Sequence, residues 1–356
     1  MTQHPFVSGI QLSRALYEGF VRPTMARLYP TVPYAAALIG PGSEVLGYDT
    51  EQSTDHDWGP RLQLFLGDTD CAQAGQGIAA AVHSALPQQV LGYPTTLATD
   101  NASEEREYRA VTVHTAGRYF ESVLGADPSG ELGPAAWLTF TDQHLRSLTT
   151  GAMFQDAVGQ LTRLREKLRY YPHDVWLYML AAQWRRIAQE EAFMGRCAQV
   201  GDELGSMLVT GRLVRDLMRL CFLMERVYAP YMKWLGTAFR ELDCGTRVAP
   251  TLLRALTATD WTARERELSS AYEIVAAMHN SLGLTDPLPT GVTPYHSRPH
   301  LVISADRFAD AIRARITDAE VLALPKHLGS IDQFTDSTDA VNIAAQFRAA
   351  YRPVEA

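Results

Sequence analysis

The sequence predicts an α+β fold, with a mixed sheet and helices first and an all-helical domain second. Short apolar runs bounded by Gly and Pro, and one run with period-two alternation, lie within the first 115 residues. Beyond about residue 153, apolar residues recur at i, i+3 and i+4 instead. A chain of 356 residues also suits two domains of about 150 residues or more. We therefore predict a first domain over 1–155 and a second over 156–356.

The first domain should contain a long helix followed by strands. Residues 8–28 have helical apolar spacing and end at a Tyr-Pro turn, whereas residues 34–39 form a short apolar run before Gly and Pro. Residues 55–66 alternate with period two, although Gly59 and Pro60 could insert a bulge or end the pairing. The other elements expected here are a helix over 69–86, strands over 108–115 and 137–140, and a short helix over 142–148.

The second domain should be a helical bundle, because its segments carry Leu, Met, Ala or aromatic residues at helical spacing. One short strand is expected near 301–303. The helices are expected over 157–169, 175–193, 203–208, 213–227, 233–242, 264–282, 306–316 and 340–351.

Charge and cysteine content narrow the function classes. The 32 Lys and Arg residues against 40 Asp and Glu give a net charge of −8, which argues against a nucleic-acid coat and against binding to anionic membranes. No apolar run reaches the roughly 20 residues of a membrane span, and the start lacks the pattern of a signal peptide. The four cysteines form no CxxC pair, so we expect free thiols and a cytoplasmic location.

A Gly-Ser pair and two aspartates follow one another between the first two predicted strands. Asp55 stands 12 positions after Ser43. On a strand, Asp55 and Asp57 would aim both carboxylates at one point, where they need a proton or a cation. Mg²⁺ prefers such oxygen ligands and shares phosphate oxygens. Gly42 and Ser43 could bring backbone N–H groups and a hydroxyl to a phosphate, so the stretch favours a metal-dependent phosphate site.

This order of motifs resembles the signature of the polymerase-β nucleotidyltransferase superfamily, in which Gly-Ser on a strand-to-helix turn precedes Asp-x-Asp on the next strand. Most of the chain further resembles an uncharacterised bacterial family of that superfamily, the domain of unknown function 4037, which joins such a domain to a long helical one. The stretches that carry the resemblance are 39–43, 55–61, 151–156, 171–176 and 228–234.

The resemblance implies transfer of a nucleoside monophosphate from an NTP to a hydroxyl of a small molecule or protein, with release of pyrophosphate. We expect the nucleotide to be ATP and the transferred group AMP. Asp55 and Asp57 would bind Mg²⁺ or Mn²⁺, and Ser43 with amides near Gly42 would hold the terminal phosphates. A small acceptor is favoured over long nucleic acid, because the chain is acidic and shows no basic stripe.

The third carboxylate of the superfamily is missing from its expected strand. That strand reads Ala-Val-Thr-Val-His over 110–114, and Thr112 takes the expected position. His114 has the same parity as Thr112, so it could act as a base. A polar residue on a half-buried strand is the more ordinary interpretation of His114. Glu107, the nearest acid, has the opposite parity.

Two basic residues are further candidates for phosphate contacts. Arg61 has the parity of the two aspartates and could contact the triphosphate. Lys233 lies in an aromatic cluster over 228–234 and could reach a phosphate, although such clusters are more often corners between helices.

Two other groups of side chains are weaker candidates. Arg212, Arg215 and Arg219 share a helix face and could line a cleft for an anion, although a salt-bridged surface face is more common. His296 and His300 have the spacing of helical metal ligands, but Pro residues around them argue against a helix and against zinc.

Two alternative functions stay open. The chain could be a catalytically weakened or inactive nucleotide sensor or scaffold of the same fold, or an antitoxin-like interaction protein that uses its helical half. Thr112 discriminates between them and the enzyme. A carboxylate near Asp55 and Asp57, from whatever strand, would favour the enzyme, whereas apolar or basic residues there would favour the sensor.

Overall fold

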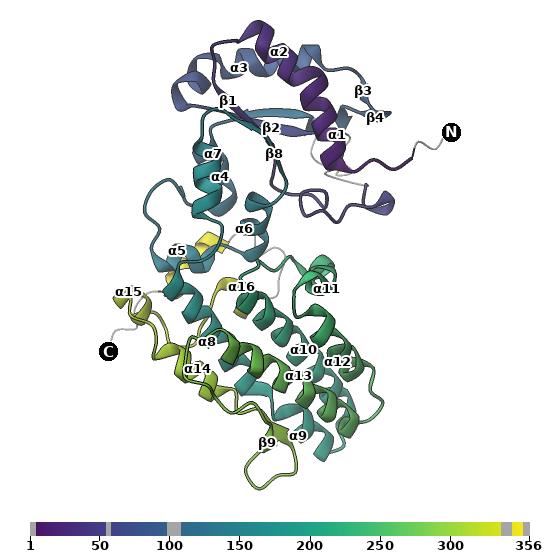
Figure 1. Ribbon diagram of the computed structural model, residues 1–356, viewed down its shortest axis with the longest axis vertical. Coiled ribbons are helices and arrows are strands. Elements are labelled where there is room, and N and C mark those ends of the chain that lie inside the picture. Colours follow the sequence, from purple (N-terminus) through teal and green to yellow (C-terminus); the bar gives the residue numbers. More distant parts are fainter. Residues whose placement is uncertain (1–4, 55–57, 98–107, 336–343, 352–356) are drawn as a thin grey trace. The chain divides into compact units, whose positions relative to one another are not determined.

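The protein is seen in a computed structural model that describes residues 5–54, 58–97, 108–335 and 344–351 (Figure 1). The α+β class is confirmed: one mixed four-stranded sheet lies in the first half and helices dominate the second. Within the described ranges, no helix combines the length and apolar character that crossing a membrane requires.

The chain divides into two compact units. Unit 1 comprises Met1–Glu131 and His144–Arg169, and unit 2 comprises Leu132–Gln143 and Tyr170–Ala356. This division differs from a single boundary after residue 155. Helix α7 (Gln160–Lys167) stays with unit 1 because it packs on strand β8 and on helix α4 of the same unit.

The sheet of unit 1 has the strand order β7-β2-β1-β8. Strand β1 (Tyr34–Leu38) runs antiparallel to β2 (Leu62–Leu66) and to β8 (Ala152–Asp156), and β2 runs parallel to β7 (Val111–His114). Because β1 and β2 are antiparallel, the end of β1 and the start of β2 meet at one edge of the sheet. Residues 39–61, the β1–β2 connection, therefore leave and re-enter the sheet at the same edge.

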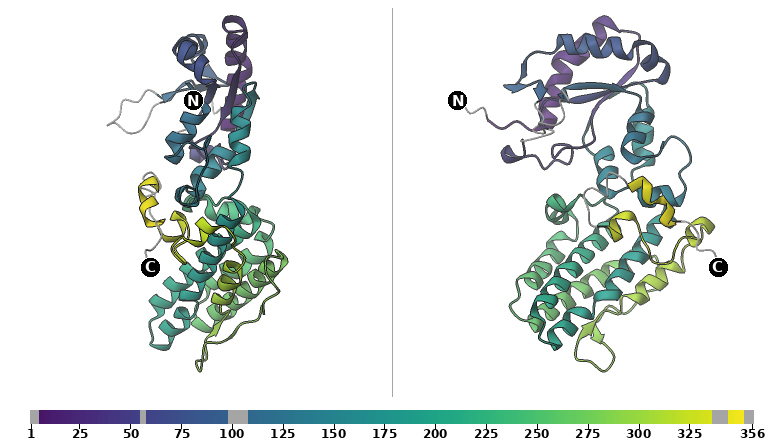
Figure 2. Two further views of the ribbon diagram at one scale, coloured as in Figure 1. Left: turned by 90° about the vertical axis from the view of Figure 1, so that its left-hand side faces the viewer. Right: turned by 180° about the vertical axis from the view of Figure 1, so that it is seen from behind.

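One face of the sheet packs on helices α1 (Gly9–Leu16), α2 (Arg22–Leu28) and α3 (Asp68–Ala85) (Figures 1 and 2). The helical spacing over 8–28 is confirmed, with a π-helical segment between α1 and α2. Alternation places the other side chains of β2 and β7 on the opposite face. The buried cluster between sheet and helices includes Leu16, Val21, Met25, Ala36, Leu62, Leu64, Leu66, Ile78 and Val82.

Two predictions for unit 1 and its border need correction, and one strand was not predicted. Of the strand expected over 55–66, residues 55–57 lie outside the described residues and β2 begins only at Leu62. The pairing ends at Gly59 and Pro60, as one alternative had it, because Gly59 has a φ of +141°, which a regular ladder does not accommodate. Residues 137–140 are not a strand but the end of helix α5 (Pro134–Thr139), whose Pro occupies the favoured first turn. Strand β8 was not predicted, because Ala152–Asp156 is short and lacks β-branched residues.

The helix predicted over 142–148 is confirmed as α6. The segment expected as one strand over 108–115 is divided between β6 and β7. The remaining elements of the first half are short. They are β3 (Gln89–Val90), β4 (Tyr93–Pro94), β5 (Thr96–Leu97), β6 (Tyr108–Arg109), α4 (Ala116–Leu124), α6 (Asp142–Thr149) and a 3₁₀ turn at Glu51–Ser53.

Unit 2 is organised around two long helices. Helix α8 packs on α10 and α14, and α10 packs also on α9, α12 and α13 (Figure 1). Its elements are α8 (His173–Glu190), α9 (Phe193–Gln199), α10 (Glu203–Glu225), α11 (Met232–Glu241), α12 (Gly245–Thr257), α13 (Trp261–Ser281), β9 (Thr293–Pro294), β10 (Leu301–Val302), α14 (Asp306–Arg313), α15 (Ala319–Leu322), α16 (Ile331–Phe334) and the 3₁₀ segment Ala344–Tyr351.

Several helices of unit 2 differ from the prediction, and the short helices α9, α15 and α16 were not predicted. The break expected between 208 and 213 is absent, because α10 runs unbroken through Gly211, and the cost of about 1 kcal/mol for a helical glycine is offset by packing. Helix α12 was not predicted. Pro250 inside it is a helix-breaking signal, yet Val248, Leu252 and Ala255 bury one face.

Candidate functional site

The candidate site of unit 1 lies in the β1–β2 connection, which carries the Gly-Ser pair. Asp55 and Asp57 lie outside the described residues. The residues on either side of them are held by the same connection, since Ser53 N–H donates to the Thr50 carbonyl over 3.0 Å and Trp58 Nε1 donates to Asp49 Oδ2 over 3.0 Å.

The Gly-Ser turn requires its glycines. Gly40 has a φ of +92° and Gly42 a φ of +126°, a region that L side chains rarely adopt. A Cβ on Gly40 would also collide with the Tyr119 hydroxyl, and one on Gly42 with the side chains of Arg61 and Glu44. The turn is therefore a tight, built structure in which backbone N–H groups can approach a ligand closely.

A buried ion pair between Arg61 and Glu44 contacts the turn. Arg61 Nε and Nη2 donate to Glu44 Oε1 over 2.8 and 2.5 Å, and Nη2 also donates to the Pro41 carbonyl. The Arg61 side chain is 3% exposed and the Glu44 side chain 0%. Because Arg61 immediately precedes β2 and Glu44 follows Ser43, the pair joins the two ends of the connection.

Glu44 is the residue of this site that the sequence reasoning missed. Burial raises the pKa of its carboxyl, while the neighbouring Arg61 guanidinium opposes the rise. Its Oε2 is buried and makes no hydrogen bond within the described part of the chain. The sequence did contain a signal for this ion pair. An acid, Glu44, directly follows Gly-Ser, and an arginine, Arg61, directly precedes the next strand, a pattern that suits a buried ion pair.

Ser43 is half-buried at the turn, and the fold uses its backbone rather than its side chain. Its carbonyl accepts a hydrogen bond from Tyr48 N–H over 2.9 Å. Its hydroxyl makes no hydrogen bond to any residue in the described ranges. The hydroxyl is therefore able to serve a ligand without disturbing the turn.

Strand β7 carries no carboxylate in its described length, Val111–His114. Thr112 is half-buried and pairs with Gln63 of β2. Gln63 Oε1 in turn accepts from Ile39 N–H over 3.1 Å at the start of the connection. The partner of Thr112 on the adjacent strand is thus a neutral polar residue.

His114 is further along the sheet from the connection than Thr112 is. It pairs with Phe65, and its ring centroid lies 6.3 Å from that of Phe65 and 5.1 Å from that of Tyr119. Burial lowers the pKa of His114, so its imidazole is neutral at pH 7. Tyr119 contacts both His114 and the β1–β2 connection, because its hydroxyl donates to the Ile39 carbonyl over 3.3 Å.

The other predicted residues lie in unit 2 and are described there alone. Lys233 is exposed on α11, with Nζ 5.2 Å from the Trp234 ring centroid. Tyr228 packs on Tyr170 and Tyr171, with ring centroids 5.1 and 5.2 Å apart, as in a corner between helices.

The two histidines with the spacing of helical metal ligands do not lie on a helix. His296 is exposed with a positive φ, whereas His300 is buried, and the two are not on a helix. No cluster of three or more His, Cys, Asp or Glu side chains suited to a metal occurs in the described ranges.

Comparison with known proteins gives one family and one structure. The model of the family described as "Domain of unknown function (DUF4037)" matches residues 137–235. A comparison with curated proteins gives no match. A solved structure of a nucleotidyltransferase-like protein from Exiguobacterium sibiricum 255-15 is similar at 12% identity over 77% of each chain, with a TM-score of 0.36. The resemblance to the domain of unknown function 4037 that the sequence predicted is thereby confirmed over residues 137–235.

Proposed function

We propose that this protein is an Mg²⁺-dependent nucleotidyltransferase that moves AMP from ATP to a hydroxyl of a small molecule or protein. The observation that supports the proposal most is the buried pair of Arg61 and Glu44. The pair holds the Gly42–Ser43 turn against Arg61, the residue that immediately precedes β2. Residues 55–57 belong to the same connection in the sequence.

In this proposal the turn binds the terminal phosphates. Backbone N–H groups near Gly42 and the Ser43 hydroxyl donate to phosphate oxygens, and no side chain has to move first, because that hydroxyl serves no described partner. Arg61 acts as a positioning residue, since its Nε and Nη2 are directed to Glu44 and Pro41.

Asp55 and Asp57 are the residues that would hold Mg²⁺, and their carboxylates have the hard oxygen donors that it prefers. When bound, the ion would neutralise the charge that develops on the phosphoryl oxygens. Neutral His114 is a candidate to accept the proton of the acceptor hydroxyl, because burial keeps it unprotonated at pH 7.

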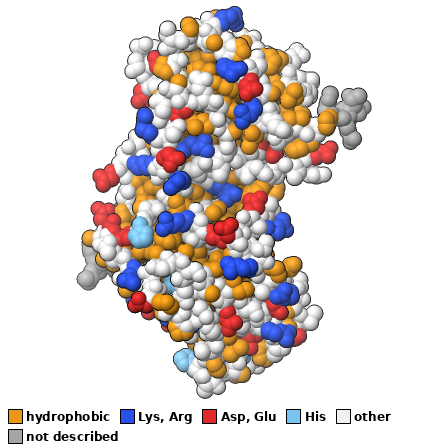
Figure 3. Space-filling model, in the orientation of Figure 1, with side chains coloured by type: hydrophobic (Ala, Val, Ile, Leu, Met, Phe, Trp, Pro, Cys, Tyr) orange, Lys and Arg blue, Asp and Glu red, His pale blue; other side chains and the backbone are white. Residues whose placement is uncertain are grey.

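A small acceptor or a protein is favoured over long nucleic acid. On the face shown in Figure 3, Lys and Arg side chains are interspersed with Asp and Glu rather than gathered in a stripe. The net charge of −8 points the same way, because phosphate contacts supply most of the affinity for nucleic acid.

Thr112 supports a second candidate function, a nucleotide sensor that binds without transfer. The superfamily's third carboxylate has a neutral hydroxyl in its place, paired with another neutral residue, Gln63. Such a site would bind a nucleotide with less stabilisation of the reaction's transition state.

Calorimetry with ATP, GTP, CTP and UTP, each with and without Mg²⁺, tests both candidates. The variants are Asp57→Ala and Ser43→Ala. The control is Glu51→Ala, which removes an exposed carboxylate from the same connection. The transferase predicts Mg²⁺-dependent binding that is lost in Asp57→Ala and kept in the control, followed by pyrophosphate release when acceptors are added. Binding with no release across hydroxyl acceptors would favour the sensor, and absence of any nucleotide binding would refute both.

A further inference from the structure

A pocket of about 410 Å³ opens in unit 1 among helix α2, the turn that follows it and strand β8. It adjoins the start of β1, whereas the β1–β2 connection leaves the other end of that strand, so the pocket contains none of the residues proposed above for nucleotide transfer. Its volume lies within the range of about 300–1,000 Å³ for small-molecule sites. We propose that this pocket binds a small aromatic carboxylic acid, with the carboxylate on Arg22 and Gln155 and the ring against the turn.

One wall of the pocket is a rigid turn. Tyr29 follows the last residue of α2, and its carbonyl accepts a hydrogen bond from Val32 N–H over 3.1 Å. Pro30 and Pro33 line the pocket beside them, and each proline ring fixes its own φ. Because the turn is closed by its own hydrogen bond, the wall has its shape before a ligand arrives, and less conformational entropy is lost on binding.

The surface that would contact the ring is apolar. Met25 is 1% exposed and Tyr34 7% exposed, and both belong to the buried cluster between sheet and helices. Tyr29 and Val32 pack against that cluster, and all four side chains line the pocket. Small-molecule sites are lined mainly by such aromatic and aliphatic side chains, on which an aromatic ring can stack. The apolar part of the pocket therefore fits an aromatic body.

Gln155 of β8 brings two N–H donors to this surface. Its Oε1 accepts from the Tyr17 hydroxyl over 2.7 Å, and Tyr17 is itself 3% exposed, so the amide is held in one orientation. Its Nε2 donates to no residue in the part of the chain that the structure describes. Gln155 is half-buried and lines the pocket, where these N–H groups can donate to a ligand oxygen.

Arg22 of α2 supplies a positive charge near the same amide. Burial raises the pKa of Tyr17, and the charge of Arg22 opposes that rise, so the guanidinium lies near the hydroxyl that is bonded to Gln155. Glu18, one turn earlier on the chain, lies 3.9 Å from Arg14 and forms its ion pair there. Among the described residues, no acidic side chain lines the pocket.

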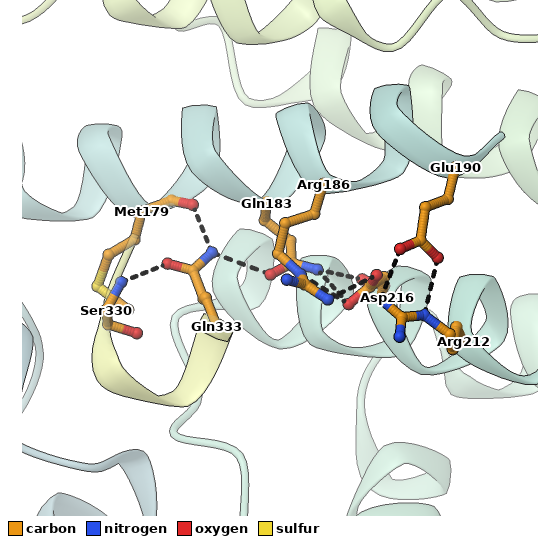
Figure 4. Close-up of polar contacts among 8 residues, drawn as sticks. All are labelled: Met179, Gln183, Arg186, Glu190, Arg212, Asp216, Ser330 and Gln333. Atoms are coloured by element: carbon orange, nitrogen blue, oxygen red, sulfur yellow. Dashed lines mark hydrogen bonds and ion pairs between the residues drawn. The ribbon is translucent and has the colours of Figure 1, made fainter. Parts of the chain in front are cut away.

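Arg22 makes no ion pair with any residue in the described ranges, unlike two arginines of unit 2. At the pocket among α8, α10 and α16, Arg186 is paired with Asp216 and Arg212 with Glu190 (Figure 4). Those guanidinium groups already have carboxylate partners. The N–H donors of Arg22 are exposed to solvent instead and are available to a ligand.

The polar lining favours a carboxylate as the head group. It offers one guanidinium and one amide, and a carboxylate has one negative charge and two oxygens that a guanidinium can bind side by side. A phosphate monoester carries a charge of about −1.5 to −2 at pH 7. Part of that charge would stay uncompensated in a pocket with a single cation.

Isothermal calorimetry on the full chain at low salt tests the proposal with four probes. These are 3-phenylpropionate, acetate as the head group alone, 3-phenylpropanol as the neutral analogue, and phenyl phosphate. We expect 3-phenylpropionate to bind with a Kd below about 1 mM. Each of the other three should bind more weakly, because it lacks the ring, the charge or the carboxylate geometry.

Matched variants locate the binding. Arg22→Gln should weaken it by roughly tenfold or more, as expected for a lost charge-assisted hydrogen bond. Arg27→Gln removes an exposed arginine of the same helix that does not line the pocket, and it should leave binding unchanged. Gln155→Glu keeps an oxygen for the Tyr17 hydroxyl but replaces the N–H donors with a negative charge, so it should weaken binding as much as Arg22→Gln does.

Two more variants separate the pocket from its surroundings. Ala26 is exposed on α2 and lines the pocket, so Ala26→Trp should fill the space without disturbing the core and should prevent binding. Ser43→Ala should have no effect, which distinguishes this site from the nucleotide site.

Four outcomes would overturn the proposal. They are a Kd of 3-phenylpropionate above about 1 mM, binding unaffected by Arg22→Gln, equal losses in Arg22→Gln and Arg27→Gln, or acetate or phenyl phosphate binding as tightly as 3-phenylpropionate. Circular dichroism melting curves of each variant confirm that a loss of binding is not a loss of folding.

Discussion

Replacing Arg61 tests whether the buried ion pair holds the β1–β2 connection in place. In Arg61→Gln, Glu44 keeps a 0% exposed carboxylate but loses the guanidinium that donates to it twice. Removing one partner of a buried pair costs about 3–5 kcal/mol, because the remaining charge is left uncompensated in a poorly solvating interior. We expect the free energy of unfolding of unit 1 to fall by that amount at pH 8.

The loss should depend on pH in one direction. Burial already raises the pKa of Glu44 above its usual value of 4.5, and without Arg61 the main influence that opposes the rise is lost and a backbone hydrogen bond is left to oppose it. A carboxyl whose folded pKa exceeds its unfolded pKa binds more protons when folded, so stability falls as pH rises above about 4.5. Arg61→Gln should therefore lose less stability at pH 5 than at pH 8.

Hydrogen exchange of the β1 and β2 amides measures this change within unit 1. A loss of about 3–5 kcal/mol corresponds to exchange that is faster by roughly two to four orders of magnitude. The control is Arg14→Gln, which removes an arginine 54% exposed and 3.9 Å from Glu18, and such surface pairs contribute about 0–1 kcal/mol. Equal effects of the two substitutions, or a loss independent of pH, would refute the reasoning.

Three further predictions concern other positions. Gly42→Ala should lower the Tm by several degrees more than Gly47→Ala in a thermal melt, because both have positive φ but only a Cβ at Gly42 meets other side chains. Burial and the nearby Asp332 raise the pKa of Asp142 to about 7, so the wild-type chain should lose stability as pH rises from about 4 to 7. Denaturant titrations measure this loss, and Asp142→Asn should make the stability less dependent on pH. Gly236→Ala should raise the free energy of unfolding by about 0.5–1 kcal/mol, since a Cβ there meets nothing within 4 Å and α11 gains helix propensity.

The sequence predicted those elements whose apolar residues form a clear pattern between Gly or Pro residues. The apolar run over 34–39 became β1, whose five residues are all buried, and the alanine-rich segment over 69–86 became α3. In both, Gly or Pro mark the ends. Elements were missed where the period was too short or was interrupted. Strand β8 acquires its conformation from pairing with β1, a tertiary contact that local pattern does not show.

The candidate site was predicted less fully than the fold. The Gly-Ser turn was expected and lies at the end of β1. Arg61 was assigned a ligand contact from strand parity, but β2 begins one residue later, so parity does not describe its direction. Its observed partner is 17 positions earlier in the chain. Two charges that far apart in sequence can be paired only by the fold, so the role of Glu44 needed the structure.

The glycine, the acid and the arginine of this connection depend on one another. Gly42 lacks a Cβ, and the space that a Cβ would fill is taken by Arg61 and Glu44. Those two charges are tolerated in the interior only because they are paired. Ser43 lies between Gly42 and Glu44 in the chain, and its hydroxyl makes no hydrogen bond to Arg61 or Glu44. A test of the whole site follows from that asymmetry: Arg61→Gln should weaken both nucleotide binding and the stability of unit 1, whereas Ser43→Ala should weaken nucleotide binding alone. A serine variant that destabilised unit 1 as much as the arginine variant would show that Ser43 belongs to the support and not to the ligand.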